Sequence, residues 1–247
     1  MQASELFNQP NTILLDGGMG TMLQAAGMKL GTRPEDLNIE NPELIRSIHA
    51  KYAAAGSRVV NANTFGASPH KLADSKYTLE EVITAGIANC KQAVAPYGAL
   101  VTLDVGPLGE LLEPSGTLAF EDAVAEYGRI VRAGVAAGAD ILYFETFTDL
   151  YEMKAALLAA KENSTLPIMA SMSFEANGRT FTGCTVESFA ATARGLGANA
   201  VGINCSLGPK EIFPMAKRLA EAVPGDFPVF VKPNAGLPRA DGSGYDI

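Results

Sequence analysis

Three side chains that can do chemistry lie at the ends of apolar runs in the sequence. Asp16 ends the run TILLD, Glu145 lies in DILYFETF, and Cys205 follows NAVGIN. Two carboxylates that face one pocket can act as a general acid and base, or can hold a substrate ammonium group by charge-assisted hydrogen bonds. A thiol at the same pocket can be a nucleophile or a zinc ligand, although a lone cysteine after an apolar run is more often a small buried hydrophobe.

A glycine-rich turn follows Asp16 in the stretch LDGGMGTML. A helix is expected to begin there, and backbone N–H groups between Gly17, Gly18 and Thr21 can bind a carboxylate or a phosphate. Alternatively, the glycines serve only the dihedral angles of a tight turn. The third glycine of the dinucleotide-binding fingerprint is missing. An anion site beside two carboxylates suits the zwitterion of an amino acid.

These residues meet only if regular elements bring them together. Short runs rich in Val, Ile and Leu, without strict polar alternation, predict parallel strands that are buried on both faces. Seven such runs occur, at 12–16, 58–65, 99–106, 140–147, 166–174, 199–206 and 227–236. Helical patterns separate them, at 18–27, 41–55, 78–96, 119–137, 149–163, 186–196 and 209–222. Asn41, Thr78 and Thr185 provide helix start signals.

The repeated strand–helix unit predicts an α/β fold of the (β/α)8 TIM-barrel type that lacks its eighth strand–helix unit. A doubly wound sheet is the competing architecture. The regular repeat, and polar residues at nearly every strand end, favour the barrel, because barrel active sites lie at the carboxyl ends of the strands. We expect residues 1–247 to form a single, C-terminally incomplete barrel domain. Its exposed strand edges would permit a homodimer.

Other polar residues at strand ends are expected to line the same cavity. Among them, we interpret Asn61, Asp104 and Ser173 as residues that satisfy loop backbone groups. His49 lies in a helical pattern and is interpreted as structural, whereas His70 is a candidate for the cavity lining. The strand-end candidates are Asp16, Asn61, Asn63, Thr64, Asp104, Glu145, Thr146, Ser173, Asn204, Cys205 and Asn234.

Composition excludes several classes of protein. The 247 residues are 47% hydrophobic, enough for one sizeable core, and the net charge of −8 argues against a nucleic-acid-binding surface. No apolar segment is long enough for a membrane helix, and the N-terminus lacks the pattern of a signal peptide, so we expect a cytoplasmic protein. Three widely spaced cysteines suit free thiols in a reducing compartment.

Several motifs, in order along the chain, resemble those of the homocysteine S-methyltransferase family, and within it the homocysteine-binding module of cobalamin-dependent methionine synthases. The resemblance covers almost the whole chain. The motifs are LLDGGMGTMLQ, PEDLNIENPELIRSIHAKYAAAGSRVVNANTFGA, LGELLEPSGTL, FETFTDLYEMKAA, GRTFTGCT, GINCSLGP and PNAGLP.

The resemblance implies a TIM barrel that binds homocysteine at its rim and holds zinc with three cysteine thiolates. Cys205 matches the first zinc ligand, and Asp16 and Glu145 match the acidic residues that bind the homocysteine amino group. The turn from Gly17 to Thr21 matches the site for its carboxylate, and Thr64 and Asn234 match further pocket lining. The implied activity is methyl transfer to the homocysteine thiol to give methionine, with methylcobalamin, carried on a separate cobalamin-binding module, as the donor.

The sequence departs from the family pattern at its C-terminal end. The family supplies the other two zinc ligands from an adjacent Cys-Cys pair after the eighth strand, and neither Cys90 nor Cys184 matches them. We therefore expect a truncated, impaired fragment. An alternative is a non-catalytic amino-acid-binding or docking module that holds no zinc. A phosphate-binding barrel lyase or isomerase ranks third, because only Lys232 lies within a strand pattern as a Schiff-base candidate.

Overall fold

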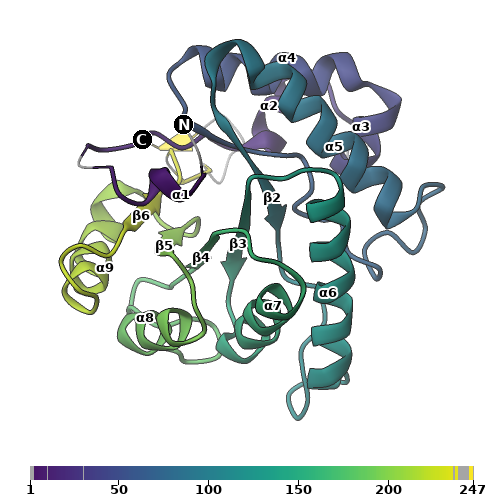
Figure 1. Ribbon diagram of the computed structural model, residues 1–247. Helices are drawn as coiled ribbons and strands as arrows, with labels where there is room; N and C mark the ends of the chain where they lie inside the picture. The colour runs from purple at the N-terminus through teal and green to yellow at the C-terminus, as the bar shows by residue number, and fades with distance from the viewer. Residues whose placement is uncertain (1–2, 10, 30, 236, 239–244, 247) are drawn as a thin grey trace.

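The computed structural model describes residues 3–9, 11–29, 31–235, 237–238 and 245–246. Its main sheet has six parallel strands in the order β1-β2-β3-β4-β5-β6, curled into an open, TIM-like barrel (Figure 1). The strands are β1 (Val59–Asn61), β2 (Leu100–Val105), β3 (Ile141–Phe147), β4 (Ile168–Met172), β5 (Ala200–Asn204) and β6 (Val229–Lys232). A separate antiparallel pair joins β7 (Leu237–Pro238) and β8 (Tyr245–Asp246).

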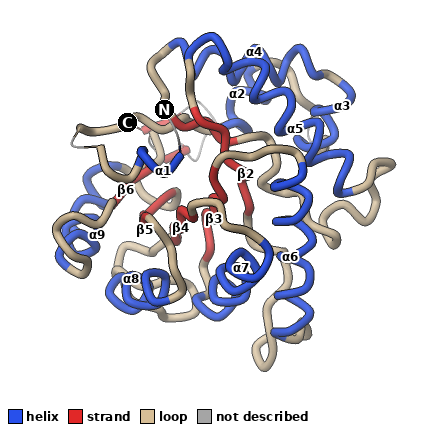
Figure 2. Tube along the Cα trace, in the orientation of Figure 1, coloured by secondary structure: helices blue, strands red, loops and turns tan. Residues whose placement is uncertain are grey.

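Helices cover the outer face of the sheet, as Figure 2 shows in blue around the red strands. The long helices lie in the segments between the predicted strands, where the sequence predicts helices. The helices are α1 (Ala3–Leu6), α2 (Met19–Ala25), α3 (Leu37–Glu40), α4 (Pro42–Ala54), α5 (Leu79–Val94), α6 (Phe120–Ala136), α7 (Leu150–Asn163), α8 (Val186–Gly195) and α9 (Pro209–Glu221), with 3₁₀ turns η1 (Pro34–Asp36) and η2 (Ala95–Tyr97).

The helix start signals are confirmed. Thr78 and Glu81 form a complete capping box at α5, which satisfies backbone N–H groups that the first turn leaves without partners. Asn41 accepts a hydrogen bond from the Leu44 backbone N–H at 3.3 Å, ahead of Pro42 in the first turn of α4. Thr185 caps α8 in the same way. No described helix is long and apolar enough to cross a membrane.

The prediction of a strand at 12–16 is wrong, although this segment is extended and lies beside β1. Leu15 forms a single parallel bridge with Val59, and backbone hydrogen bonds join Asp16 to Val59 at 3.2 Å and Arg58 to Leu14 at 2.9 Å. The segment pairs on one side only in the described part of the chain, and Leu14 is 57% exposed. One-sided pairing with a three-residue strand does not sustain a longer ladder.

The strands position the site because their two ends differ. Parallel strands that are buried on both faces form the core, and β2, β4 and β5 are fully buried along their lengths. Leu6 of α1 packs into an apolar cluster at the amino ends of the strands, which contains Val59, Leu100, Ile141, Tyr143, Met169 and Ala200. Polar residues therefore gather at the carboxyl ends.

Candidate functional site

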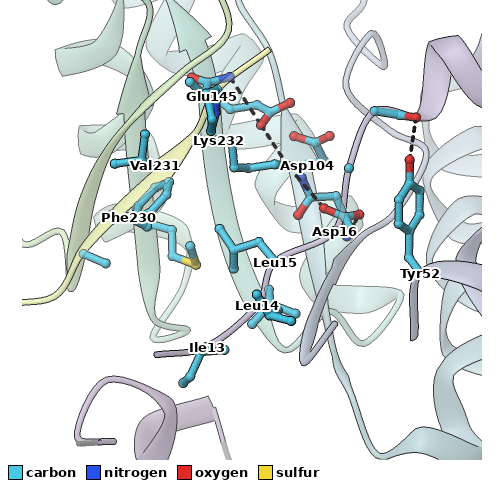
Figure 3. A pocket seen from close by; sticks show the side chains of 18 of the residues that line it. Ile13, Leu14, Leu15, Asp16, Tyr52, Asp104, Glu145, Phe230, Val231 and Lys232 are labelled. Carbon is cyan, nitrogen blue, oxygen red and sulfur yellow. Dashed lines mark hydrogen bonds and ion pairs between the residues drawn. The ribbon is translucent and has the colours of Figure 1, made fainter. Parts of the chain in front are cut away.

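A cavity of about 1450 Å³ runs through the open barrel. Its apolar wall comes from the amino ends of the strands, with residues such as Met169 and Phe230, and its polar wall comes from their carboxyl ends (Figure 3). It is flanked on one side by the segment 11–16 and on the other by β6. The polar side chains that line it include Asp16, Asn61, Asn63, Asp104, Glu145, Thr146, Asn204, Cys205, Lys232 and Asn234.

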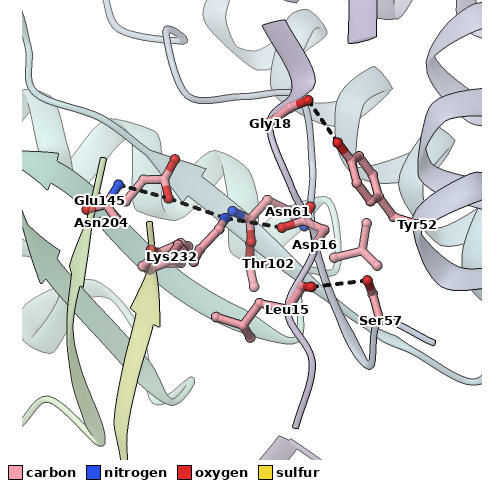
Figure 4. A network of polar contacts seen from close by, with 12 residues as sticks. Leu15, Asp16, Gly18, Tyr52, Ser57, Asn61, Thr102, Glu145, Asn204 and Lys232 are labelled. Atoms are coloured by element: carbon pink, nitrogen blue, oxygen red, sulfur yellow. Dashed lines mark hydrogen bonds and ion pairs between the residues drawn. The ribbon is translucent and has the colours of Figure 1, made fainter. Parts of the chain in front are cut away.

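The two carboxylates that the sequence pairs do converge, and an internal ammonium group lies between them. Lys232 Nζ is 3.2 Å from Asp16 Oδ1 and 3.5 Å from Glu145 Oε2 (Figure 4). Asp16 Oδ2 also accepts the backbone N–H of Asn61 at 2.8 Å. Burial lowers the pKa of Lys232, but the carboxylates of Asp16 and Glu145 outweigh it, so its pKa is raised and the group remains charged.

Cys205 lies beside the same polar cluster, at the carboxyl end of β5. Its Sγ accepts a hydrogen bond from Asn204 Nδ2 at 3.3 Å and is 3.8 Å from Thr146 Oγ1. Burial, followed by the nearby charge of Glu145, raises the pKa of the thiol. The side chain is therefore a neutral thiol at neutral pH unless a cation binds it.

The backbone around this thiol is held in a sparsely populated conformation. Thr146, Cys205 and Ser206 have φ values of 66°, 58° and 60°. Such left-handed conformations cost about 1–3 kcal/mol for residues other than glycine and cluster at functional sites. Asn204 links the two strand ends, because its Oδ1 accepts the Thr146 backbone N–H at 3.0 Å and its Nδ2 donates to Thr146 Oγ1 at 2.7 Å.

The glycine turn is packed against α4. A Cβ at Gly17 would lie 2.9 Å from Cε1 and the hydroxyl oxygen of Tyr52, so a close approach requires glycine there. The Tyr52 hydroxyl donates to the Gly18 carbonyl at 3.0 Å, and the Thr21 hydroxyl donates to the same carbonyl at 3.2 Å. Gly17, Gly18 and Thr21 all line the cavity, together with Asn234.

Thr64 lies behind the cavity wall rather than on it. Its hydroxyl donates to the Asp104 carbonyl at 2.8 Å and accepts the Asp104 backbone N–H at 3.1 Å. His70 is also absent from the lining, and its Nδ1 lies 2.8 Å from Glu110 Oε1. His49 is fully buried in α4, and both its ring nitrogens lack a hydrogen-bond partner among the described residues.

The interpretation of three strand-end residues as backbone-satisfying groups holds for Ser173, whose hydroxyl donates to the Asn204 carbonyl at 2.8 Å. The Asn61 side chain instead accepts the Thr102 hydroxyl at 3.0 Å, which is a contact between two side chains. Asp104 also departs from it, since its Oδ1 is buried without a hydrogen-bond partner in the described part of the chain. The interpretation of Asp104 is therefore wrong for this oxygen, and the Thr64 hydroxyl bonds the backbone N–H and carbonyl of Asp104 itself.

Sequence reasoning missed the counter-ion role of Lys232. It considered this residue only as a Schiff-base candidate, although a lysine inside the apolar run FPVFVKP is itself a signal, since buried lysines need paired charges. The described residues also contain no group of three His, Cys, Asp or Glu side chains placed to hold a metal ion. Cys205 is therefore a lone thiol donor at the described rim.

A family model described as homocysteine S-methyltransferase matches residues 13–247. The chain belongs to this family. The methionine synthase of Mycobacterium tuberculosis is 29% identical over 252 residues, which cover 94% of this chain and 21% of that protein. The methionine synthase of Mycobacterium leprae is also 29% identical, with the same coverage. The chain thus spans about a fifth of the length of these curated relatives.

Solved structures support the family assignment and the fold. The homocysteine methyltransferase MmuM from Escherichia coli, in its metallated form, superposes with a TM-score of 0.84 at 25% identity, over 94% of this chain and 86% of that chain. The carboxyl transferase domain of Rhizobium etli pyruvate carboxylase superposes at 0.56 with 15% identity, over 93% of this chain and 37% of that chain. The second likeness concerns the fold alone.

Proposed function

We propose that this homocysteine S-methyltransferase family member binds homocysteine in the barrel cavity and presents its thiol for methylation to methionine. The observation that carries this proposal is the meeting of Asp16, Glu145 and Cys205 in one cavity. Carboxylates suit the substrate ammonium, and the turn at Gly17 and Gly18 suits its carboxylate. The substrate sulfur would then extend toward Cys205.

Binding and orientation are the tasks that these residues can perform directly. The substrate amino group enters a polar region in which the buried carboxyl groups outnumber the ammonium group of Lys232 among the described residues. Hydrogen bonds from Asn204 to Glu145 and from the Asn61 N–H to Asp16 hold both side chains before the substrate binds. Preorganised groups hold a reactant near its attack geometry without an ordering cost at the moment of reaction. The narrow fit of Gly17 against Tyr52 fixes the turn in the same way.

We propose zinc as the metal of this family member, with Cys205 as one of its thiolate ligands. The metallated relative and the sequence motif GINCS support this proposal. The described residues do not form a zinc site by themselves, since they offer this one thiol and no group of three ligating side chains. Methylcobalamin on a separate module is the proposed donor, supported by the methionine synthase relatives.

Calorimetric titration with homocysteine tests the binding proposal. Glu145→Gln and Asp16→Asn each remove one negative charge with little change in shape, and each should weaken homocysteine binding about tenfold or more, as expected for a charge-assisted hydrogen bond. Asp149→Asn is the matched control. It removes a charge outside the cavity lining and preserves the N-cap of α7, because asparagine caps as well as aspartate does. Unchanged affinity in both pocket variants refutes the proposal.

A non-catalytic amino-acid-binding module remains the second candidate, and the incomplete set of metal ligands among the described residues favours it. Metal analysis separates the two candidates. The enzyme proposal expects stoichiometric zinc that is lost in Cys205→Ala. Homocysteine binding without metal, at an affinity that Cys205→Ala leaves unchanged, supports the binding module instead.

A further inference from the structure

Asp104 holds a buried carboxylate oxygen that the protein leaves without a partner. The residue lies in β2, is 6% exposed and lines the cavity, and its Oδ1 makes no hydrogen bond to any described residue. Figure 3 shows its carboxylate next to Glu145, Lys232 and Asp16. A buried polar atom without a partner costs about 1–3 kcal/mol, and more when it is charged, so the fold sustains this arrangement at the expense of stability.

The backbone of Asp104 is held in place on two sides. Thr64 contacts both the N–H and the carbonyl of Asp104 through a single hydroxyl, at 3.1 Å and 2.8 Å. Neighbouring strands hold the same residue in register, with Asp104 paired to Tyr143 of β3. The side chain therefore projects from a fixed point in the cavity wall, and no described residue supplies a hydrogen-bond partner for its Oδ1.

The cavity also holds more negative than positive groups. Asp16, Glu145 and Asp104 face one ammonium, that of Lys232, and each oxygen of Asp16 already accepts one hydrogen bond, from Lys232 and from the Asn61 N–H. Lys232 contacts Glu145 as well, whereas none of the described residues donates a hydrogen bond to Asp104 Oδ1. A second cationic donor is what this cluster needs, and burial together with the charge of Glu145 raises the pKa of Asp104 in its absence.

We propose that Asp104 binds the α-ammonium group of the substrate, alongside Glu145 and Asp16, while Lys232 keeps its contact with Asp16. This inference rests on the proposed binding of homocysteine. It adds a further substrate-binding residue, and it explains why a lysine lies between the carboxyl groups. Lys232 holds the carboxylates together in the empty site, and the substrate supplies the second cation. Thr64 is then a positioning residue, which acts through the backbone of Asp104.

The test compares two ligands that differ by one amino group. Homocysteine and 4-sulfanylbutanoic acid, which lacks the amino group, are each titrated into the full chain and into Asp104→Asn, under reducing conditions. The proposal expects Asp104→Asn to bind homocysteine about tenfold or more weakly, and to bind 4-sulfanylbutanoic acid with less than about a twofold change. A structural disturbance of the pocket would weaken both ligands equally, and equal weakening refutes the inference.

The remaining outcomes are also decisive. If Glu145→Gln weakens homocysteine binding and Asp104→Asn does not, the inference fails while the proposed function stands. If the unaltered chain does not bind homocysteine, both fail together. Asp104→Ser removes the same carboxylate and takes the place of Asp104→Asn should the asparagine variant not fold, as judged by its thermal unfolding transition.

Discussion

Lys232 Nζ lies 3.2 Å from Asp16 Oδ1, and this contact joins two segments that are 216 residues apart in the sequence. Lys232 ends β6, and Asp16 ends the extended segment beside β1, so the ion pair links the two sides of the open barrel. Both side chains are largely buried, at 15% and 4% exposure. A buried pair of this kind contributes little against apolar replacements, but the loss of one partner leaves a charge without compensation.

Lys232→Met is therefore expected to destabilise the chain by about 3–5 kcal/mol, because Asp16 and Glu145 lose their shared cation. Urea unfolding, with the midpoint and slope measured together, checks this value. Lys232→Arg keeps the positive charge and should lose less. The double variant Lys232→Met with Asp16→Asn should recover part of the loss, and a single variant as stable as the original chain contradicts the assigned role.

Gly17→Ala and Gly20→Ala should act in opposite directions. An added methyl group at Gly17 meets the Tyr52 ring and hydroxyl at 2.9 Å, so we expect a loss of about 1–3 kcal/mol from overpacking. Gly20 lies within α2 and has no heavy atom within 4 Å of an added Cβ, so alanine there should add about 0.5–1 kcal/mol through helix propensity. Similar unfolding midpoints for the two variants would show that the turn is not tightly packed.

His49 should make the chain acid-sensitive. Burial lowers its pKa to about 4, below the ordinary value of 6.5, so the unfolded chain takes up a proton first as the pH falls. The loss of stability that comes from protonation of His49 is small above pH 6.5, grows as the pH falls toward 4, and levels off below pH 4. The loss between pH 7 and pH 5 is roughly 2 kcal/mol, from about 1.4 kcal/mol per pKa unit.

The control for this prediction is His49→Gln, which has no titrating group in that range. Urea unfolding of both chains at pH 7 and pH 5 isolates the histidine, because the other titrating groups are shared. The variant should lose less stability than the original chain over this interval. Equal losses would mean that His49 finds a partner, or water, that the described contacts do not include.

Asp104→Asn should stabilise the chain when no ligand is bound. The substitution replaces a buried carboxyl group, whose Oδ1 has no partner, with a neutral amide of nearly the same shape. We expect a gain of about 1 kcal/mol, measured as a higher thermal unfolding midpoint, together with the weaker homocysteine binding described above. A lower midpoint would indicate that the Asp104 carboxyl group stabilises the fold, which would contradict its role as an unpartnered ligand-binding group.

The sequence predicts most of the scaffold because its signals are local. The capping box of Thr78 and Glu81 and the apolar runs that form β2 to β6 depend on neighbours within one element, and these elements are confirmed, although β6 is only half-buried. The extended segment around Leu15 is different. Its apolar composition is that of a strand, but a ladder also needs partners, and the segment has one short neighbour among the described residues.

The site follows the same division. Strand-end position alone predicts that Asp16, Glu145 and Cys205 share a cavity, since the carboxyl ends of parallel strands meet at one face. Hydrogen-bond partners cannot be predicted in this way, because they depend on side chains that are far apart in the sequence. The Thr64 hydroxyl is thus used by the backbone of Asp104, and the Lys232 ammonium lies where a substrate amino group alone was expected.

A crystal structure of the chain with bound selenohomocysteine tests the central claim most directly, because the anomalous signal of selenium locates the substrate's reactive atom. The account predicts a selenium peak at the carboxyl ends of the strands, beside Cys205 Sγ, with the substrate amino group within hydrogen-bond distance of Glu145 and Asp104. A peak at the apolar end of the cavity, near Met169 and Ala200, or at a site outside the cavity, would contradict it.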